Sequence, residues 1–461
     1  MEELAVHNTA ALDPEQRDQY TQALRSVAQL RNVPAIVTYQ DIQGKGMLNY
    51  SGGMKIPHTV AHFGQRKLFL SELHFLTGYL KRRAAKLGMV PAKPILVVYP
   101  GAAPSKHTGY LAHLFPEVTF LLVDPTAFRV KLHPHNAAIV DLTALAPTTT
   151  TQSPVGLSET RESSICTDAD WFGVVSEISL NSKIYTLNGM FTDPLAQALT
   201  SHFSSTADIV LISDIRTNTA ANIPDDLDTC WNLAQQFLWV KILNPTAYLL
   251  KFRYPYYVDT RRGEEATTTA FVDRFNKCAG EQMFVNTFSA ALQEGLDVVG
   301  DYAAQRVHYL PGTLDIQAFP GQSSTELRLS NLDYHHDHAL IDYPDWKTYE
   351  SEMCMFNKVW RPLMLHRNPY ANRELGFDHC NDCALEALFW EEYLTYRKIH
   401  LTVSNVRKHV LTLHRYSCGP LSVQHHGYWF GDYQAILDRL VDQDQTSKRS
   451  KADLTATSSK V

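Results

Sequence analysis

Two short apolar runs that each end on a charged residue constrain the fold of this chain more than any other feature of its sequence. Residues 209–214 read Ile-Val-Leu-Ile-Ser-Asp, and residues 246–251 read Thr-Ala-Tyr-Leu-Leu-Lys. Such runs are typical of strands buried in a parallel sheet. Between them, residues 227–243 carry apolar side chains at helical spacing, as expected for the crossover helix of a parallel strand pair. The two runs predict a βαβ unit of an open α/β sheet.

The charges that end these runs, Asp214 and Lys251, are predicted to meet at one edge of the sheet. In an open α/β sheet the carboxyl ends of the strands face the ligand crevice. Two interpretations stay open for the pair. It is either a structural ion pair that closes two strand ends or part of a catalytic site, because both arrangements perturb pKa values.

A second unit of the same kind is predicted earlier in the chain. Residues 94–99 and 118–124 read as buried strands, and a loop that begins at Gly101 follows the first of them. The glycine allows the backbone to approach a ligand closely, and Asp124, about 20 residues further on, can accept hydrogen bonds from ribose hydroxyls. We interpret this as the nucleotide-binding half of a Rossmann-like sheet. A plain tight turn and a capped strand are the alternative.

The composition is that of an ordinary globular protein, with 44% hydrophobic and 20% charged residues among 461. No apolar run approaches the roughly 20 residues of a membrane helix, and the acidic start does not resemble a signal peptide, so no membrane partner is expected. Seven cysteines, an odd number, favour a reducing compartment. The net charge of −6 excludes no partner, because nucleic-acid binding needs only a local basic face.

Changes in pattern divide the chain into four predicted parts. These are a helical segment at 1–46, an α/β domain at 47–332 with a Thr- and Ser-rich surface insertion at about 142–182, a helical C-terminal extension at 333–441 and a disordered tail at 442–461. Cys380 and Cys383 have the spacing of a structural zinc site, but buried thiols are favoured and no metal is predicted. The basic residues 448–451 are either a nuclear import patch or, as we favour, part of a solvated tail.

Four stretches in a fixed order carry a resemblance to a known family. They read Gly-Gln-Arg-Lys-Leu-Phe-Leu-Ser-Glu-Leu from Gly64, Val-Tyr-Pro-Gly-Ala-Ala-Pro from Val98, Leu-Ile-Ser-Asp-Ile-Arg from Leu211 and Ile-Leu-Asn-Pro-Thr-Ala-Tyr-Leu-Leu-Lys-Phe-Arg-Tyr-Pro-Tyr from Ile242. With residues 325–329 and 349–359, they resemble the poxvirus cap-specific mRNA 2′-O-methyltransferases, which double as stimulatory subunits of the viral poly(A) polymerase. The insertion and the C-terminal extension are more similar to the kinetoplastid relatives that methylate the cap-4 of spliced-leader RNA.

The resemblance implies a Rossmann-like S-adenosylmethionine-dependent methyltransferase sheet of the FtsJ (RrmJ-like) type, which methylates the ribose 2′-OH of a cap-proximal nucleotide. It implies a Lys–Asp–Lys–Glu tetrad formed by Lys67, Asp214, Lys251 and Glu326. Lys251 would accept the proton, Asp214 would orient Lys251, and Lys67 and Glu326 would hold the ribose. A lysine can accept a proton near neutral pH only if its pKa is lowered, which partial burial and a second lysine favour.

The resemblance also implies binding residues. For the cofactor they are Gln65, Tyr99, Gly101, Ser105, Asp124, Phe191 and Thr192, where Ser105 replaces the usual glycine and Thr126 replaces an expected arginine. For the cap and RNA they are Tyr50, Arg253, Tyr256 and Glu350, with aromatic faces that hold the charged methylated guanine and a carboxylate that reads its edge. Tyr39 competes with Tyr50 for one aromatic face. Arg261, Arg262 and Arg328, like Arg253, are candidates for phosphate contacts.

The expected partner is capped mRNA or spliced-leader RNA, and the expected location is the nucleus, with the cytoplasm as the alternative. The alternative function is that of a non-catalytic capped-RNA-binding or polymerase-stimulating subunit, although all four residue types of the tetrad are present. An adenosine-cofactor enzyme that acts on a small molecule is a third possibility, which the aromatic and basic residues 252–257 disfavour.

Overall fold

The computed structural model describes residues 34–48, 64–88, 92–134, 138–147, 168–181, 183–216, 226–254, 306–320, 324–334, 339–361 and 381–417, with the short pieces 258–259 and 264–265 and a few single positions. Several predictions fall on other residues. Most of the N-terminal segment, Tyr50, Tyr256, Cys380 and the tail with its basic patch lie outside the described residues.

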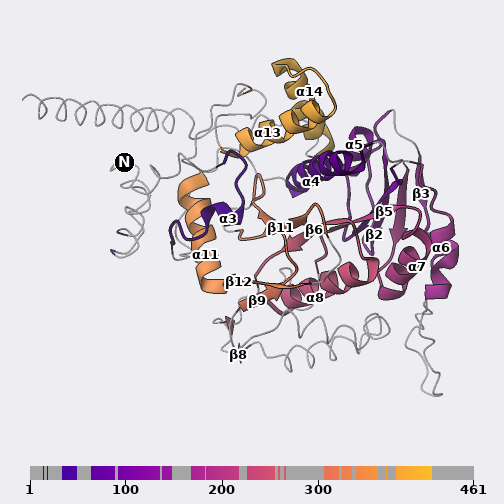
Figure 1. Ribbon diagram of the computed structural model, residues 1–461, viewed down its shortest axis with the longest axis horizontal. Helices are drawn as coiled ribbons and strands as arrows, with labels where there is room; N and C mark the ends of the chain where they lie inside the picture. Colours follow the sequence, from indigo (N-terminus) through magenta and orange to yellow (C-terminus); the bar gives the residue numbers. More distant parts are fainter. Residues whose placement is uncertain are drawn as a thin grey trace, which may run out of the picture.

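An eight-stranded sheet forms the centre of the structure, in the order β10-β11-β6-β5-β1-β2-β4-β3 (Figure 1). Neighbouring strands from β3 to β6 are parallel, β11 is antiparallel to β6, and β10 is antiparallel to β11. The strands are β1 (Ile95–Pro100), β2 (Val118–Asp124), β3 (Ile139–Asp141), β4 (Ile184–Asn188), β5 (Asp208–Ser213), β6 (Ala247–Phe252), β10 (Thr313–Asp315) and β11 (Leu327–Asn331). The four strands predicted above are β1, β2, β5 and β6, each shifted by no more than one residue.

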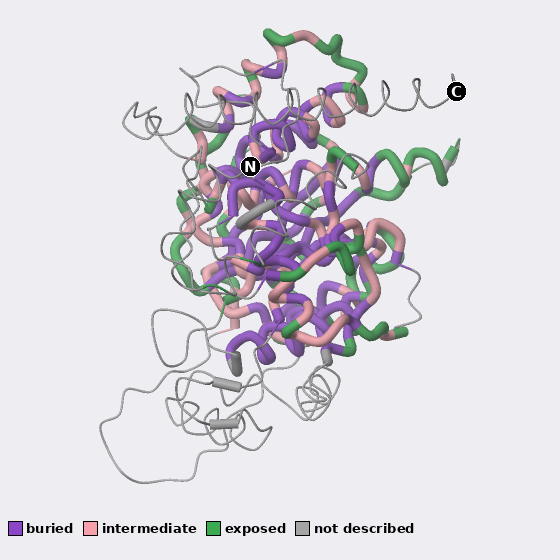
Figure 2. The backbone as a smooth tube through the Cα atoms, turned by 90° about the vertical axis from the view of Figure 1, so that its left-hand side faces the viewer, coloured by how far each residue is buried: buried purple, intermediate pink, exposed green. Residues whose placement is uncertain are grey.

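Helices cover both faces of the sheet and make a three-layer structure (Figure 1). One face packs against α4 (Gly64–Leu87), α5 (Thr108–Leu114), α13 (Asn381–Tyr396) and α14 (Val403–Ser417). The other packs against α3 (Tyr39–Ile42), α6 (Phe172–Ser176), α7 (Asp193–Phe203), α8 (Asp226–Leu243) and α11 (Trp346–Met355). The predicted crossover helix is α8, and the buried residues concentrate along the sheet between the two layers (Figure 2). This α/β architecture is compatible with the predicted Rossmann-like class.

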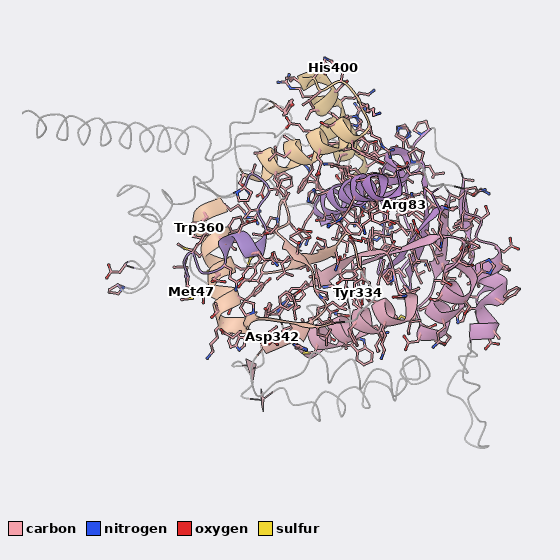
Figure 3. All side chains as sticks on the ribbon, in the orientation of Figure 1. Met47, Arg83, Tyr334, Asp342, Trp360 and His400 are labelled. Carbon is pink, nitrogen blue, oxygen red and sulfur yellow. The ribbon has the colours of Figure 1, made fainter. Side chains whose placement is uncertain are left out.

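Smaller elements complete the described part of the chain. β9 (Arg306–Tyr309) pairs with β12 (Ile341–Asp345), and β7 (Val258–Asp259) pairs with β8 (Glu264–Glu265), both antiparallel. Three short helical turns are η2 (Thr143–Leu145), η3 (Asp168–Trp171) and η4 (Phe356–Trp360). The backbone N–H of Leu48 donates to the carbonyl of Ser351, so the end of the described segment 34–48 lies on α11, near the Met47 and Trp360 labels of Figure 3.

The predicted surface insertion at about 142–182 is narrower than expected. Trp171, Val174, Val175 and Ile178 are buried in the same cluster as α7, because their apolar side chains fill the space beside that helix. The prediction of a surface segment is therefore wrong for this C-terminal part. Residues 148–167, which carry most of the Thr- and Ser-rich sequence, lie outside the described residues.

The alternation of side chains along the strands determines which charged residues face α4. The residues two and four positions before Asp214, and two and four positions before Lys251, pack in the cluster that includes α4. Because side chains two residues apart in a strand point to the same face, Asp214 and Lys251 continue on the α4 face. The register pairs Arg328 of β11 directly with Lys251 of β6, which places Arg328 beside them.

The chain order reverses between β1 and β5, so the carboxyl ends of these strands form the topological switch point where open α/β sheets bind ligands. Gly101 follows β1 at this point with φ of 77°. A Cβ on Gly101 would lie 2.5 Å from the backbone nitrogen of Ile215 and 2.6 Å from the carbonyl carbon of Asp214. The glycine is needed here because the two strand ends touch, and this contact brings the loop after β1 against Asp214.

Replacing Gly101 by alanine is expected to destabilise the protein by at least about 1–2 kcal/mol, the usual cost of a left-handed backbone for a residue with a Cβ. The contact with the backbone of Ile215 adds to this cost. Thermal unfolding measures the effect. Gly189→Ala is the matched control, because a Cβ there meets no atom within 4 Å, and an equal loss of stability in both variants would contradict the close approach.

Candidate active site

Four charged side chains from distant parts of the sequence lie together at the carboxyl edge of the sheet. They come from the first turn of α4, from the residue after β5, from β6 and from the residue before β11: Lys67, Asp214, Lys251 and Glu326. Each side chain is between 12% and 18% exposed. The group is thus largely shielded from water but keeps one side open.

Acids and cations alternate within this group. Lys67 Nζ lies 2.7 Å from Glu326 Oε1. Lys251 Nζ lies 3.2 Å from Asp214 Oδ1 and 3.4 Å from Glu326 Oε2, so Lys251 bridges both carboxylates. The structure therefore brings the four residues of the predicted tetrad into one connected cluster.

Arg328 is a third cation in this cluster, and the prediction that it contacts phosphate is wrong. Its side chain is 3% exposed, and its Nη2 donates to Asp214 Oδ1 at 2.7 Å. The other guanidinium nitrogens donate to the carbonyl of Ser213 and to Oε1 of Gln317. The sequence did indicate where this side chain lies. Arg328 follows Glu326 by two residues at the start of a strand, so the two side chains point to the same face of the sheet.

The cations determine the charge state of the two acids. Burial alone would raise the pKa of Asp214, but Lys251 and then Arg328 outweigh it and hold this pKa below its ordinary value. Burial is likewise outweighed at Glu326, whose pKa lies well below its ordinary value because of Lys251 and then Lys67. Both carboxylates are therefore ionised at neutral pH.

The backbone of Lys251 is held by a buried amide from α8. Gln236, which is fully buried, donates through Nε2 to the carbonyl of Lys251 at 2.9 Å and accepts through Oε1 from its N–H at 3.1 Å. The pairing of β5 with β6 ends at Ser213 and Leu250, so the side chain of Gln236 takes the place of a strand partner. This fixes the strand end from which the Lys251 side chain extends.

A cleft that is open to solvent reaches this cluster. Its lining residues combine members of the cluster with polar and basic side chains: Arg216, Thr229, Asn232, Leu233, Lys251, Arg253 and Glu326. Arg253 was predicted, whereas Arg216 was missed although it follows Asp214 by two residues. The predicted phosphate contacts Arg261 and Arg262 lie outside the described residues.

Two residues that were predicted to bind the cofactor hold the loop after β1 in place by accepting hydrogen bonds from its backbone. Gln65 Oε1 accepts from the backbone N–H of Lys106 at 3.1 Å. Asp124 accepts through Oδ2 from the N–H of Ala103 at 3.1 Å and through Oδ1 from the N–H of Thr126 at 2.7 Å. A carboxylate has about four acceptor positions, so two remain at Asp124 for further donors such as ribose hydroxyls.

Ser105 lies in the same loop with φ of 52°, a left-handed conformation that favours glycine. Its hydroxyl is hydrogen-bonded to the Oγ1 of Thr108 at 2.7 Å, at the start of α5. The backbone of Ser105 thus has the conformation that glycine adopts most readily, and the serine side chain adds a hydrogen bond to Thr108.

The other predicted cofactor residues have structural contacts. Tyr99 is 2% exposed and its hydroxyl donates to Glu72 at 2.7 Å. Phe191 is buried and packs edge-to-face on Trp239, and Thr192 caps the N-terminus of α7 through its side chain. The side chains of Tyr99 and Phe191 therefore support the elements below the crevice.

Two of the predicted cap-binding residues, Arg253 and Glu350, are described and lie near one another. Glu350, on α11, is half-buried; burial raises its pKa and the nearby charge of Arg253 opposes this. Because Arg253 also lines the cleft, α11 of the C-terminal extension is close to the cleft. The two predicted aromatic faces, Tyr50 and Tyr256, lie outside the described residues.

Tyr39, the competing candidate for an aromatic face, is a core residue. It is 1% exposed and its hydroxyl is hydrogen-bonded to Glu352. Its ring lies 5.0 Å from that of Tyr349, which in turn stacks on Tyr254 with ring centroids 4.1 Å apart. Tyr39 is therefore too deeply buried to stack on a cap, and this alternative is wrong.

The zinc alternative remains open, because Cys380 lies outside the described residues. Cys383 is a buried cysteine on α13 that forms no disulfide with another described cysteine. Within the part of the chain that the structure describes, no three histidine, cysteine or acidic side chains are grouped as a metal ion would require. Among the described helices, none has the length and apolar character needed to cross a membrane.

Comparison with known protein families gives a match to part of the chain. A model of the poly(A) polymerase regulatory subunit family matches residues 176–263. This segment contains β4, α7, β5, α8 and β6, and with them Asp214 and Lys251, but it excludes Lys67 and Glu326. The match indicates a link to mRNA processing and points to RNA or a polymerase as the class of partner. No curated protein matches the chain.

Proposed function

We propose that this protein transfers a methyl group from S-adenosylmethionine to the ribose 2′-OH of a cap-proximal nucleotide in capped RNA. The observation that carries this proposal is the cluster of Lys67, Asp214, Lys251 and Glu326 at the carboxyl edge of the sheet, beside an open cleft. If these ion pairs served only to close the ends of two strands, no cleft beside them would be needed. The family match to a poly(A) polymerase regulatory subunit supports an RNA substrate.

The edge formed by β1 and β2 fits an adenosine-type cofactor. Asp124 keeps acceptor positions for ribose hydroxyls, and Gln65 fastens the neighbouring loop at Lys106. These two residues would hold S-adenosylmethionine, which supplies a methyl group on a positively charged sulfur. A mostly parallel sheet in which β11 alone runs against the other seven strands supports the finer assignment to a methyltransferase of the FtsJ type.

In this proposal Lys251 accepts the proton of the reacting hydroxyl. A ribose hydroxyl is a weak nucleophile at neutral pH, so its proton must leave as its oxygen bonds to the methyl carbon. S-adenosylmethionine would supply the methyl group and keep the electron pair of the carbon–sulfur bond on sulfur, and Nζ of Lys251, once it has given up its own proton to water, would accept the proton of the hydroxyl. Asp214 and Glu326 orient this nitrogen, and Lys67 holds Glu326 in place.

Transfer of labelled methyl from S-adenosylmethionine to RNA tests the proposal. Capped RNA is expected to be methylated and the same RNA without a cap is expected to react poorly, because Glu350 and the neighbouring extension are assigned to the cap. Equal methylation of both RNAs would show that the protein does not recognise the cap. If neither RNA is methylated although S-adenosylmethionine binds, the result would favour the alternative of an enzyme that uses this cofactor on a small molecule.

A subunit that binds capped RNA for a poly(A) polymerase without catalysis is the second candidate, and the family match favours it. It requires the cleft but not the proton-handling role of Lys251. Binding of capped RNA by the wild-type protein in the absence of any methyl transfer would support this candidate over the first.

Arg216 and Arg253 are expected to contact phosphates of the RNA in the cleft. Arg216→Gln and Arg253→Gln should each weaken RNA binding, and each lost contact should reduce the slope of log affinity against log salt by about 0.7 for single-stranded RNA. Arg82→Gln is the control, because Arg82 is 56% exposed, on the last part of α4. Unchanged slopes in both cleft variants would show that the RNA lies elsewhere.

A further inference from the structure

A buried network underlies the loop that follows β1, and the proposed chemistry does not use it. His107, Glu72 and Tyr99 are each no more than 2% exposed. His107 Nε2 lies 2.9 Å from Glu72 Oε2, and the hydroxyl of Tyr99 donates to Glu72 Oε1. His107 Nδ1 lies 3.0 Å from Oε1 of Gln65. The imidazole of His107 thus lies between two side chains of α4.

The hydrogen bonds determine how the ring of His107 is oriented. Gln65 Oε1 also accepts from the N–H of Lys106, so the amide oxygen and not the amide nitrogen faces the ring. Nδ1 of His107 must therefore donate. Nε2 faces a carboxylate, and a neutral imidazole donates from only one nitrogen. These contacts fix the orientation of the ring, with Nδ1 toward Gln65 and Nε2 toward Glu72.

The same network connects three parts of the candidate site. Gln65 and Glu72 are on α4, the helix that provides Lys67. Tyr99 is in β1, and burial and then the charge of Glu72 raise its pKa well above the ordinary value, which keeps its hydroxyl a donor. His107 itself ends the loop that begins at Gly101. No other described contact of the loop joins it to both Gln65 and Glu72.

We propose that His107 is a positioning residue that fixes residues 101–107 against α4 in the conformation that receives S-adenosylmethionine. This inference rests on the proposed function. The contact of His107 with Gln65 holds the residue assigned to the cofactor, and its contact with Glu72 anchors the ring in the core. The two contacts have separate effects, so substitutions can separate them.

Two variants of His107 test the proposal, each of which keeps one contact. In His107→Gln the amide nitrogen takes the place of Nε2, so the contact with Glu72 is kept and that with Gln65 is lost. The KM for S-adenosylmethionine is expected to rise roughly ten-fold or more, with kcat and thermal stability nearly unchanged. In His107→Asn the amide nitrogen takes the place of Nδ1, so Glu72 keeps Tyr99 but loses its contact with the ring, and the main effect is expected on thermal stability.

His202→Gln is the control, because His202 is exposed on α7, on the opposite face of the sheet. Calorimetry with S-adenosylmethionine and nitrogen-15 spectra of labelled histidine complete the test. Equal affinity for S-adenosylmethionine in wild type and His107→Gln, or an unprotonated Nδ1 at His107, would overturn the inference while the proposed function stands. If the wild-type protein binds no S-adenosylmethionine, the proposed function fails and this inference fails with it.

Discussion

Lys251→Ala is expected to lower the rate of methyl transfer to capped RNA by about 10²- to 10⁴-fold, the usual contribution of a residue that transfers a proton in the rate-limiting step. Lys251 Nζ is the one nitrogen within 3.5 Å of both carboxylates among the described lysines, so no neighbouring lysine replaces it. Affinity for S-adenosylmethionine should stay unchanged, because Lys251 makes no described contact with the loop at 101–107. Single-turnover transfer and calorimetry measure the two quantities.

Lys251→Arg separates two roles of this residue. Arginine keeps the positive charge between Asp214 and Glu326 but does not give up its proton. If Lys251 accepts the proton, the arginine variant should be as inactive as the alanine variant. Substantial transfer by Lys251→Arg would contradict that role and leave Lys251 a charge that orients the hydroxyl. Lys241→Ala, an exposed lysine in the last turn of α8, is the control and should be fully active.

Arg328→Met is expected to destabilise the protein by about 3–5 kcal/mol, the usual cost of removing one partner of a buried ion pair. Asp214, the carbonyl of Ser213 and the amide oxygen of Gln317 would all lose a donor at a largely buried site. Chemical unfolding measures the loss. Adding Asp214→Asn to Arg328→Met should recover part of the lost stability, because it removes the carboxylate charge that lost Arg328 as a partner.

The loss in Arg328→Met is expected to depend on pH. The folded-state pKa values of Asp214 and Glu326 lie below those of the unfolded chain. Their contribution to stability is therefore fully present above the unfolded value of about 4 and is lost as the pH falls through the folded values. The difference between wild type and Arg328→Met should be largest near neutral pH and shrink below about pH 4. Arg216→Met, an exposed arginine, should change stability by no more than about 0.5 kcal/mol.

The sequence predicted the part of the site that is built on strand ends. Asp214 and Lys251 end apolar runs, and the general geometry of parallel sheets was enough to bring them together. Lys67 was found only through the resemblance to a known family, because a lysine on an amphipathic helix resembles any solvated residue. Its neighbour in space, Glu326, precedes a strand that pairs with β6 across a long sequence separation, which no local pattern predicts.

Other features were missed for identifiable reasons. α14 lies in the extension that was predicted to be helical, but its bounds were not predicted, although Val406, Val410 and Leu413 have helical spacing and are buried in the cluster that includes α4. The structural role of Arg328 was missed because arginines near a proposed RNA site were considered only as phosphate contacts. The network of His107 and Glu72 depends on the packing of a loop against a helix, and a single histidine in a sequence gives no sign of such a partner.

Mass mapping of ribose methylation on a capped oligonucleotide, after incubation with the protein and S-adenosylmethionine, tests the proposed function most directly. One added methyl on the 2′-oxygen of a cap-proximal nucleotide is expected with the wild-type protein and none with Lys251→Ala. A methyl group found on a base, or a ribose methyl that persists at the wild-type rate in Lys251→Ala, would contradict the assignment of this cluster as a 2′-O-methyltransferase site.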